Sequence, residues 1–192
     1  MSALPLQLVL IRHGETEWSR DGRHTGRTDL PLTDEGVREA ERVRELVRRF
    51  SFERVLSSPL SRALETSRLA GFGDAVETRD ELREWDYGDY EGKTTVEIHQ
   101  TDPNWVLWRD GCPGGERPAD VGARADRLLS QLAGGHGDVA LFGHGHMLRV
   151  LTARWLELAP FEGGRFALDT ATLSVLGWEH DWHTIRTWNS PA

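Results

Sequence analysis

Arg12 and His13 follow directly after the apolar run Leu8–Ile11, and Gly14 comes next along the chain. This order predicts a buried strand that presents reactive side chains at its C-terminal end, the edge where open α/β sheets bind ligands. Arginine can grip a phosphate or carboxylate at two points, and a neutral imidazole can act as a nucleophile near pH 7. The alternative is an ordinary surface turn, so an anion site here requires partners elsewhere in the chain.

A second cation is predicted beside this strand end. Ser58 follows another short apolar run, and a helix is expected from Pro59 to Gly71, since proline suits the first helical position and glycine a helix end. Arg62 lies one turn into this helix, where side chains lean back toward the helix N-terminus and its free N–H groups. We expect Arg62 to point at the sheet edge, with an ion pair to a nearby glutamate as the alternative.

A third apolar run, Val139–Gly143, leads into His144 and a predicted amphipathic helix. A single histidine at such a position is more often a helix cap than a catalyst. Three strand ends that each present a cation or an imidazole are harder to explain by structure alone. Together they predict one site at the C-terminal edge of a mostly parallel sheet.

These motifs resemble those of the histidine phosphatase superfamily, the phosphoglycerate-mutase-like enzymes. Arg12–Thr16 (RHGET) is similar to the nucleophile motif of that family, Ser58–Arg62 (SPLSR) to its second arginine motif, and Phe142–Gly145 (FGHG) to its second histidine motif. The resemblance covers nearly the whole chain, with the motifs in the expected order. It implies a phosphoric monoester hydrolase.

Three other segments are most similar to the fungal sedoheptulose-1,7-bisphosphatase branch of this superfamily: Thr25–Thr33, Leu82–Gly92 and Trp108–Glu116. His24 stands where that branch is expected to carry an aromatic residue. Ser19 replaces the asparagine that commonly follows the tryptophan in mutases. Both differences concern the substrate rather than the chemistry.

The resemblance implies a mechanism through a phosphohistidine. His13 would attack phosphorus as a neutral imidazole, while Arg12, Arg62 and His144, the last as an imidazolium, would hold the phosphate oxygens. Glu84 would protonate the leaving oxygen. The alternative for Glu84 is a surface carboxylate paired with its neighbouring arginine, and the rival candidates for the acid are Asp86 and Glu91.

Further substrate contacts are expected from loops at the sheet edge: Gly14, Thr25, Gly26, Ser58, Tyr90, Arg109 and Gly145. Arg109 or Arg27 could receive a second phosphate of a bisphosphate. His24 and His146 are extra pocket candidates, with surface histidines as the alternative.

The composition limits the classes of function. The 192 residues include 38% hydrophobic residues and eight tryptophans, which indicates a folded globule, and we expect a single histidine phosphatase domain over 1–192. A net charge of −8 argues against nonspecific nucleic-acid binding, and one cysteine excludes an internal disulfide. No apolar stretch approaches the ~20 residues of a membrane span, and Met1–Gln7 does not resemble a secretory signal. We therefore expect a cytoplasmic enzyme without membrane or nucleic-acid partners and without cofactor, with a homo-oligomer left open.

The sequence disfavours two other classes of function. A metal-dependent hydrolase is disfavoured, since His144 and His146 lie two apart without a matching ligand motif. A catalytically inactive phosphate-binding scaffold is disfavoured because both histidines and both arginines are present. Within the enzyme class, the alternatives are a cofactor-dependent phosphoglycerate mutase and a broad-specificity acid phosphatase.

The order of elements predicts a three-layer α/β/α sandwich with a mostly parallel central sheet and one antiparallel strand. A short turn, Glu179–Trp182, must join the last two strands in antiparallel fashion. The segment Asp86–Glu116 is rich in Gly, Asp and aromatics, and should form loops and short helices that roof the sheet edge. Helices are expected after Thr33 and over 118–133. Strands are expected at Leu6–Arg12, Arg54–Ser57, Ala75–Glu77, Val139–Gly143, Thr172–Trp178 and His183–Trp188.

Overall fold

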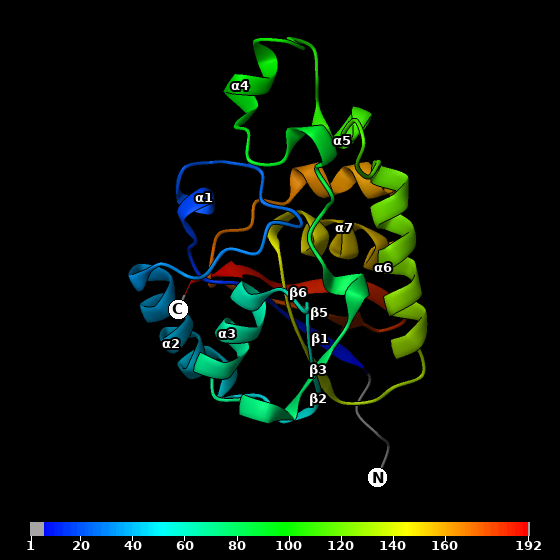
Figure 1. The fold of residues 1–192 in the computed structure, drawn as a ribbon. Coiled ribbons are helices and arrows are strands. Elements are labelled where there is room, and N and C mark those ends of the chain that lie inside the picture. Colours follow the sequence, from blue (N-terminus) through cyan, green and yellow to red (C-terminus); the bar gives the residue numbers. More distant parts are fainter. Residues whose placement is uncertain (1–5, 192) are drawn as a thin grey trace.

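Six strands form one sheet in the computed structural model, which describes residues 6–191 (Figure 1). The strand order is β3-β2-β4-β1-β5-β6, and the first four of these pair in parallel. Strand β5 runs antiparallel to both of its neighbours, so the predicted sheet with one antiparallel strand is confirmed. The strands are β1 (Gln7–Arg12), β2 (Phe52–Ser57), β3 (Val76–Thr78), β4 (Asp138–Gly143), β5 (Leu173–Glu179) and β6 (Trp182–Ser190).

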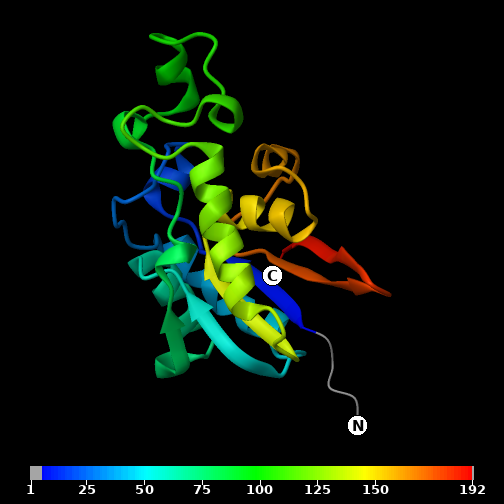
Figure 2. The same cartoon turned by 90° about the vertical axis from the view of Figure 1, so that its right-hand side faces the viewer.

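Four longer helices cover the two faces of this sheet. They are α2 (Asp34–Val47), α3 (Ser61–Leu69), α6 (Pro118–Leu132) and α7 (Gly145–Trp155). The side chains of α2 and α3 share a core with one face of the sheet, and those of α6 and α7 share a core with the other face. The expected three layers are therefore present, with α6 lying along the sheet in Figure 2.

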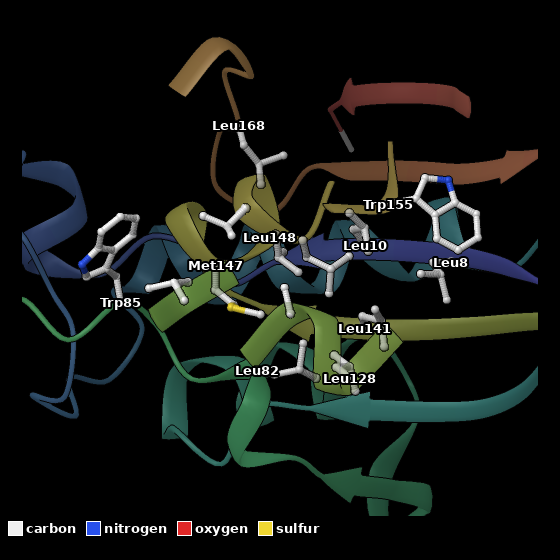
Figure 3. Close-up of a cluster of buried hydrophobic side chains, with 14 of the residues drawn as sticks. Leu8, Leu10, Leu82, Trp85, Leu128, Leu141, Met147, Leu148, Trp155 and Leu168 are labelled. Carbon is white, nitrogen blue, oxygen red and sulfur yellow. The ribbon is translucent and has the colours of Figure 1, made fainter. Parts of the chain in front are cut away.

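Alternation along β1 explains how both cores form. Leu8 and Leu10 point to the α6–α7 side, where Figure 3 shows them beside Leu141 and Leu148, whereas Val9 and Ile11 point to the α2–α3 side. All four β1 side chains are fully buried. A continuous apolar run is what a parallel strand covered on both faces requires.

The start predicted for one helix was wrong. The helix predicted from Pro59 begins at Ser61, because the backbone N–H of Leu60 donates to the Ser58 hydroxyl and Leu60 stays extended as the N-cap residue. The helix after Thr33 ends at Val47, and Phe50 beyond it packs against the same core from a loop.

The segment between Asp86 and Glu116, here called the roof, stands above the C-terminal edge of the sheet (Figures 1 and 2). It contains the short helices η3 (Gly88–Tyr90), α4 (Thr95–His99) and α5 (Leu107–Asp110). Its two arms touch through their backbones, since a Cβ on Gly88 would lie 2.2 Å from the Pro113 carbonyl oxygen. Cys112 is buried here, and burial raises the pKa of its thiol to about 12, so it is neutral.

The remaining short elements are α1 (Glu17–Arg20), η1 (Gly73–Ala75), η2 (Asp80–Leu82) and η4 (Pro160–Arg165). None of the helices within residues 6–191 has the length and apolar character needed to cross a membrane. Met1–Pro5, most of the segment expected not to be a secretory signal, lie outside the described residues.

Candidate active site

The three predicted strand ends meet at one place. Strand β4 lies between β1 and β2, so His13 after β1, Ser58 after β2 and His144 after β4 come together at the same edge. The ring centroids of His13 and His144 are 5.1 Å apart. Arg62 reaches this point from the first turn of α3 and is fully buried.

His13 is held as a neutral imidazole with one nitrogen free. Its Nδ1 lies 2.7 Å from the carbonyl oxygen of Gly14, and a carbonyl can only accept, so Nδ1 carries the hydrogen. Burial, with the nearby charges of Arg62 and Arg12, holds the pKa of His13 well below its ordinary value. Nε2 therefore keeps an unprotonated lone pair, as a nucleophile requires.

His144 is also neutral, but its hydrogen sits on the opposite nitrogen. The Nε of Arg62 donates to Nδ1 of His144 over 3.1 Å, so the hydrogen of the imidazole lies on Nε2, 2.8 Å from the Ser58 hydroxyl. Burial and the Arg62 charge hold the pKa of His144 well below its ordinary value. The imidazolium expected at His144 is thus wrong for the free protein, because a guanidinium can only donate.

Arg62 donates most of its hydrogen bonds to other groups of the protein. Besides His144, it donates to the carbonyl oxygens of Thr25, Gly26 and Thr28 over 3.0–3.1 Å. Since arginine has five N–H groups, four hydrogen bonds leave one for a phosphate oxygen. Arg62 therefore ties the loop of residues 25–28 to the strand ends, a task that its sequence position alone did not indicate.

Arg12 keeps a guanidinium N–H that no described residue accepts. One guanidinium nitrogen donates to the Leu168 carbonyl, whereas its Nε is buried and has no hydrogen-bond partner among the described residues. A Cβ on Gly145 would lie 3.3 Å from the Arg12 guanidinium carbon. Glycine at this position thus lets the helix α7 begin directly beside the charge.

Glu84 lies against the N-terminus of α7. Its Oε1 accepts the backbone N–H groups of Trp85 and Met147, each over 2.9 Å, and its Oε2 accepts that of His146 over 3.0 Å. The carboxyl group is 6% exposed and is therefore fixed in the wall of the site. Because Oε1 has two donors and Oε2 has one, Oε2 is the oxygen with capacity for a transferable proton.

The Glu84 backbone is held from behind by Arg124 of α6. Arg124 forms a two-point ion pair with Glu116 at 2.7 and 2.8 Å, and it donates to the carbonyl oxygens of Glu81, Arg83 and Glu84. The Glu116 carboxylate also accepts the N–H of Asp86 over 2.9 Å. The chain on both sides of Glu84 is thus attached to one ion pair, here called the Arg124–Glu116 clamp.

A cavity of about 180 Å³ lies beside His13. Its lining includes the predicted residues Arg12, His13, Thr25, Glu84 and Gly145, and the two extra candidates His24 and His146. The other lining residues were not predicted: Ser19, Gly22, Arg23, Tyr87 and Arg149.

Helical spacing could have predicted that Arg149 lies near the cavity. It lies three residues after His146 on α7, so both side chains share one helix face. Its guanidinium donates to the carbonyl oxygens of Gly163 and Gly164 over 3.1 Å and lies 4.5 Å from the Trp108 ring centroid. Arg23 forms an ion pair with Glu97 of the roof at 3.0 Å. No local sequence pattern indicates this contact.

Gly14, Gly26 and Ser58 lie around the cavity rather than in its lining. The Gly14 N–H donates to the Thr66 hydroxyl over 3.1 Å, and a Cβ there would lie 2.3 Å from the Gly36 carbonyl oxygen. Gly26 holds Arg62, and Ser58 holds His144, as described above. These residues hold the neighbouring side chains and loops of the site in place without lining the cavity.

Two residues predicted to contact the substrate do not line the cavity. Arg109 is turned to the surface, where it pairs with Asp110 at 2.7 Å and donates to the Asn104 carbonyl. Tyr90 is buried against Trp105, with ring centroids 5.1 Å apart. Both predictions depended on roof loops, and the short helices of the roof direct these side chains elsewhere.

The other uncertain residues have structural partners. Arg27 pairs with Asp86 at 2.7 Å on the surface. Glu91 accepts the N–H groups of Gly26 and Thr28 at 2.9 and 3.0 Å, so neither rival of Glu84 shares its place in the wall. Among the described residues, no three His, Cys, Asp or Glu side chains are grouped so that they could hold a metal ion.

The sequence is similar to named phosphatases over most of its length. A model of the histidine phosphatase superfamily (branch 1) matches residues 8–191. The chain is 44% identical over 179 residues to an acid phosphatase of Mycobacterium tuberculosis, covering 91% of this chain and 87% of that protein. It is 35% identical over 190 residues to the sedoheptulose 1,7-bisphosphatase of Saccharomyces cerevisiae, covering 82% and 70%.

Solved structures have the same fold. The product of a Mycobacterium tuberculosis open reading frame has a TM-score of 0.90 and 40% identity, with 96% of this chain and 97% of that chain covered. A mycobacterial glucosyl-3-phosphoglycerate phosphatase in complex with VO3 has a TM-score of 0.86 and 28% identity, with 96% and 98% covered. The chain therefore belongs to the histidine phosphatase superfamily (branch 1) and is a phosphoric monoester hydrolase.

Proposed function

We propose that this protein hydrolyses small phosphorylated metabolites, namely sugar phosphates or bisphosphates, through a phosphohistidine at His13 and without a metal ion. The observation that carries the proposal is one cavity lined by a neutral imidazole with an unprotonated nitrogen, a half-buried arginine and a carboxyl group. His13 supplies the nucleophile, Arg12 the charge for the phosphate oxygens, and Glu84 the proton.

The reaction needs two displacements at phosphorus. His13 Nε2 attacks the phosphorus atom, the bond to the ester oxygen breaks, and Glu84 transfers its proton to that oxygen. Water then attacks the phosphohistidine, Glu84 takes a proton from the water, and the neutral imidazole leaves. Arg12, together with the remaining N–H of Arg62 and the Nε2–H of His144, would stabilise the charge on the transferring phosphoryl group.

The substrate class is supported by relatives and by the cavity. The names of two relatives specify phosphorylated sugars: sedoheptulose 1,7-bisphosphatase, and a glucosyl-3-phosphoglycerate phosphatase at 34% identity. A cavity of about 180 Å³ walled by imidazoles and a phenol suits a small polar ligand. The similarity to an acid phosphatase favours broad specificity as the second candidate.

Rapid quenching in alkali tests the mechanism. With ³²P-labelled sugar phosphate, we expect one acid-labile, alkali-stable phosphate on His13, none on His13→Ala, and full activity after chelation. Complete loss on chelation, restored by a divalent ion, would contradict the proposal.

A substrate panel tests the class. Phosphate released from sugar phosphates and bisphosphates is expected to exceed that from phosphopeptides. A flat profile would favour the broad-specificity phosphatase. Interconversion of 2- and 3-phosphoglycerate with little free phosphate would favour a mutase.

A further inference from the structure

Two histidines of the cavity have no part in the mechanism above. His24 lies in the loop after α1, and His146 lies in the first turn of α7, yet their ring centroids are 6.2 Å apart. Both line the cavity that also contains His13 and Glu84. Two imidazoles from distant segments thus face the same small space.

His24 has an unsatisfied nitrogen. Its Nε2 is buried and has no hydrogen-bond partner within residues 6–191. The ring is positioned by Tyr87 and Trp105, at centroid distances of 4.8 and 5.6 Å, and the backbone N–H donates to the Lys93 carbonyl. Burial lowers the pKa of His24 to about 4, so the ring is neutral at pH 7. A buried polar atom without a partner is costly, and a ligand that supplies one is favoured.

His146 is oriented beside the candidate acid. Its Nδ1 shares a hydrogen with the Tyr87 hydroxyl over 2.7 Å, and the same nitrogen lies 3.9 Å from Glu84 Oε2. Burial raises the pKa of Tyr87 and lowers that of His146, so both groups are neutral. With Nδ1 occupied, Nε2 is the nitrogen left for a ligand.

In-line displacement puts the leaving group opposite His13, on the side of Glu84. On that side His146 Nδ1 lies 3.9 Å from Glu84 Oε2, and the His24 ring centroid lies 6.2 Å from that of His146. Each of these neutral imidazoles offers a donor or an acceptor to a hydroxyl group. We propose that His24 and His146 form a subsite for the hydroxyl groups of the leaving alcohol, so that the preferred substrates are phosphate monoesters of small polyhydroxylated alcohols. This inference rests on the proposed phosphatase function.

A pair of substrates that differ only in hydroxyl groups tests the subsite. Glycerol 1-phosphate and propyl phosphate have the same carbon chain, and the wild type is expected to prefer the former in kcat/KM. His24→Phe and His146→Phe should each lower kcat/KM for glycerol 1-phosphate by about 3–10-fold, as for one lost hydrogen bond, and that for propyl phosphate by less than about twofold. His24→Gln, which retains a polar group near Nε2, should keep part of the preference.

His183→Phe is the matched control. His183 also stacks on aromatic rings, Trp155 and Trp178, but it lies on β6 and outside this cavity. Its substitution should leave the substrate ratio unchanged. An equal ratio in the wild type and both cavity variants would overturn the subsite.

Phosphohistidine formation from phenyl phosphate separates the two hypotheses. If the wild type forms it without preferring glycerol 1-phosphate, only the subsite is wrong. If no phosphohistidine forms from any substrate, the proposed function itself fails. The same measurement, with circular dichroism, shows whether each variant is folded.

Discussion

The Nε of Arg62 donates to Nδ1 of His144 over 3.1 Å, and this contact decides which imidazole nitrogen carries the hydrogen. The hydrogen on Nε2 points toward Ser58 and makes His144 a neutral donor. The neutral ring needs no prior protonation to donate this hydrogen bond. The arginine therefore acts through the histidine as much as through its own charge.

Arg62→Lys is expected to slow phosphoryl transfer by about 10²–10³-fold, as does loss of an aligned donor to a developing charge. Lysine keeps the charge but cannot reach the imidazole and three carbonyl oxygens together. Each carbonyl left unpaired should cost about 1–3 kcal/mol of the free energy of unfolding. The ¹⁵N shifts of His144 check the cause, since the variant should show mixed tautomers; unchanged shifts would contradict it.

Glu84→Gln is expected to reduce turnover of alkyl phosphates by about 10²–10⁴-fold, because the amide cannot release a proton to an alkoxide. The phosphorylation step with p-nitrophenyl phosphate should be affected far less, since that oxygen leaves without help. Single-turnover measurements on both substrates check this. Asp86→Asn is the control, and equal losses on both substrates would exclude Glu84 as the acid.

Arg124→Met should make the position of the Glu84 carboxyl group less fixed, although residue 124 does not line the cavity. We expect a loss on alkyl phosphates of about tenfold, smaller than that of Glu84→Gln, and little loss in phosphorylation by aryl phosphates. Guanidinium ion added to Arg124→Ala should restore part of the activity. Arg154→Met removes a comparable pair with Asp126, 2.8 Å, away from the cavity, and should have no leaving-group dependence.

Arg149→Met should weaken turnover of a sugar bisphosphate more than that of the matching monophosphate, by about tenfold or more. Arg149 is a cation in the cavity lining, so we expect it to pair with a second phosphate of the substrate. Arg109→Met is the control, since Arg109 is held by Asp110 on the surface. A larger effect from the Arg109 variant would reverse this assignment.

Stability should fall as the pH drops below about 6.5. His13, His24, His144 and His146 have lowered pKa values because of burial, so in this range the unfolded chain binds protons that the folded chain does not. Each histidine contributes full stability above about pH 6.5 and loses up to roughly 1.4 kcal/mol per pH unit below it. For His24 the loss continues to about pH 4.

Urea unfolding of the wild type and His24→Phe between pH 7.5 and 5 checks this. The variant lacks one titrating group, so its stability should fall less steeply with pH. Equal slopes would mean that folding does not lower the pKa of His24.

Several parts of the site could be predicted from sequence because they depend on local patterns. A fully apolar run indicates a strand covered on both faces, and parallel strands present their C-terminal ends at one edge. His13, Arg12 and His144 follow such runs directly, so their convergence requires only that β1 and β4 be neighbours. Arg62 follows from the phase of a helix that begins at this edge.

The predictions failed where the packing of the roof or a partner far along the chain decides the direction or protonation of a side chain. Arg109 and Tyr90 lie in the roof, where Asp110, the Asn104 carbonyl and Trp105 direct them away from the cavity. The hydrogen on His144 depends on Arg62, which is 82 residues away in the chain. Neither periodicity nor motif spacing carries this information.

The sequence by itself determined the fold class, the family and the reactive side chains, because these follow from local hydrophobic patterns and short motifs. The tertiary structure alone decided the protonation pattern of the imidazoles, the support of Glu84 by Arg124, and the replacement of Arg109 by Arg149 at the cavity. These features depend on hydrogen bonds and burial between segments that meet only when the sheet, α6, α7 and the roof have packed together. Such contacts are cooperative, so no single segment of the chain specifies them.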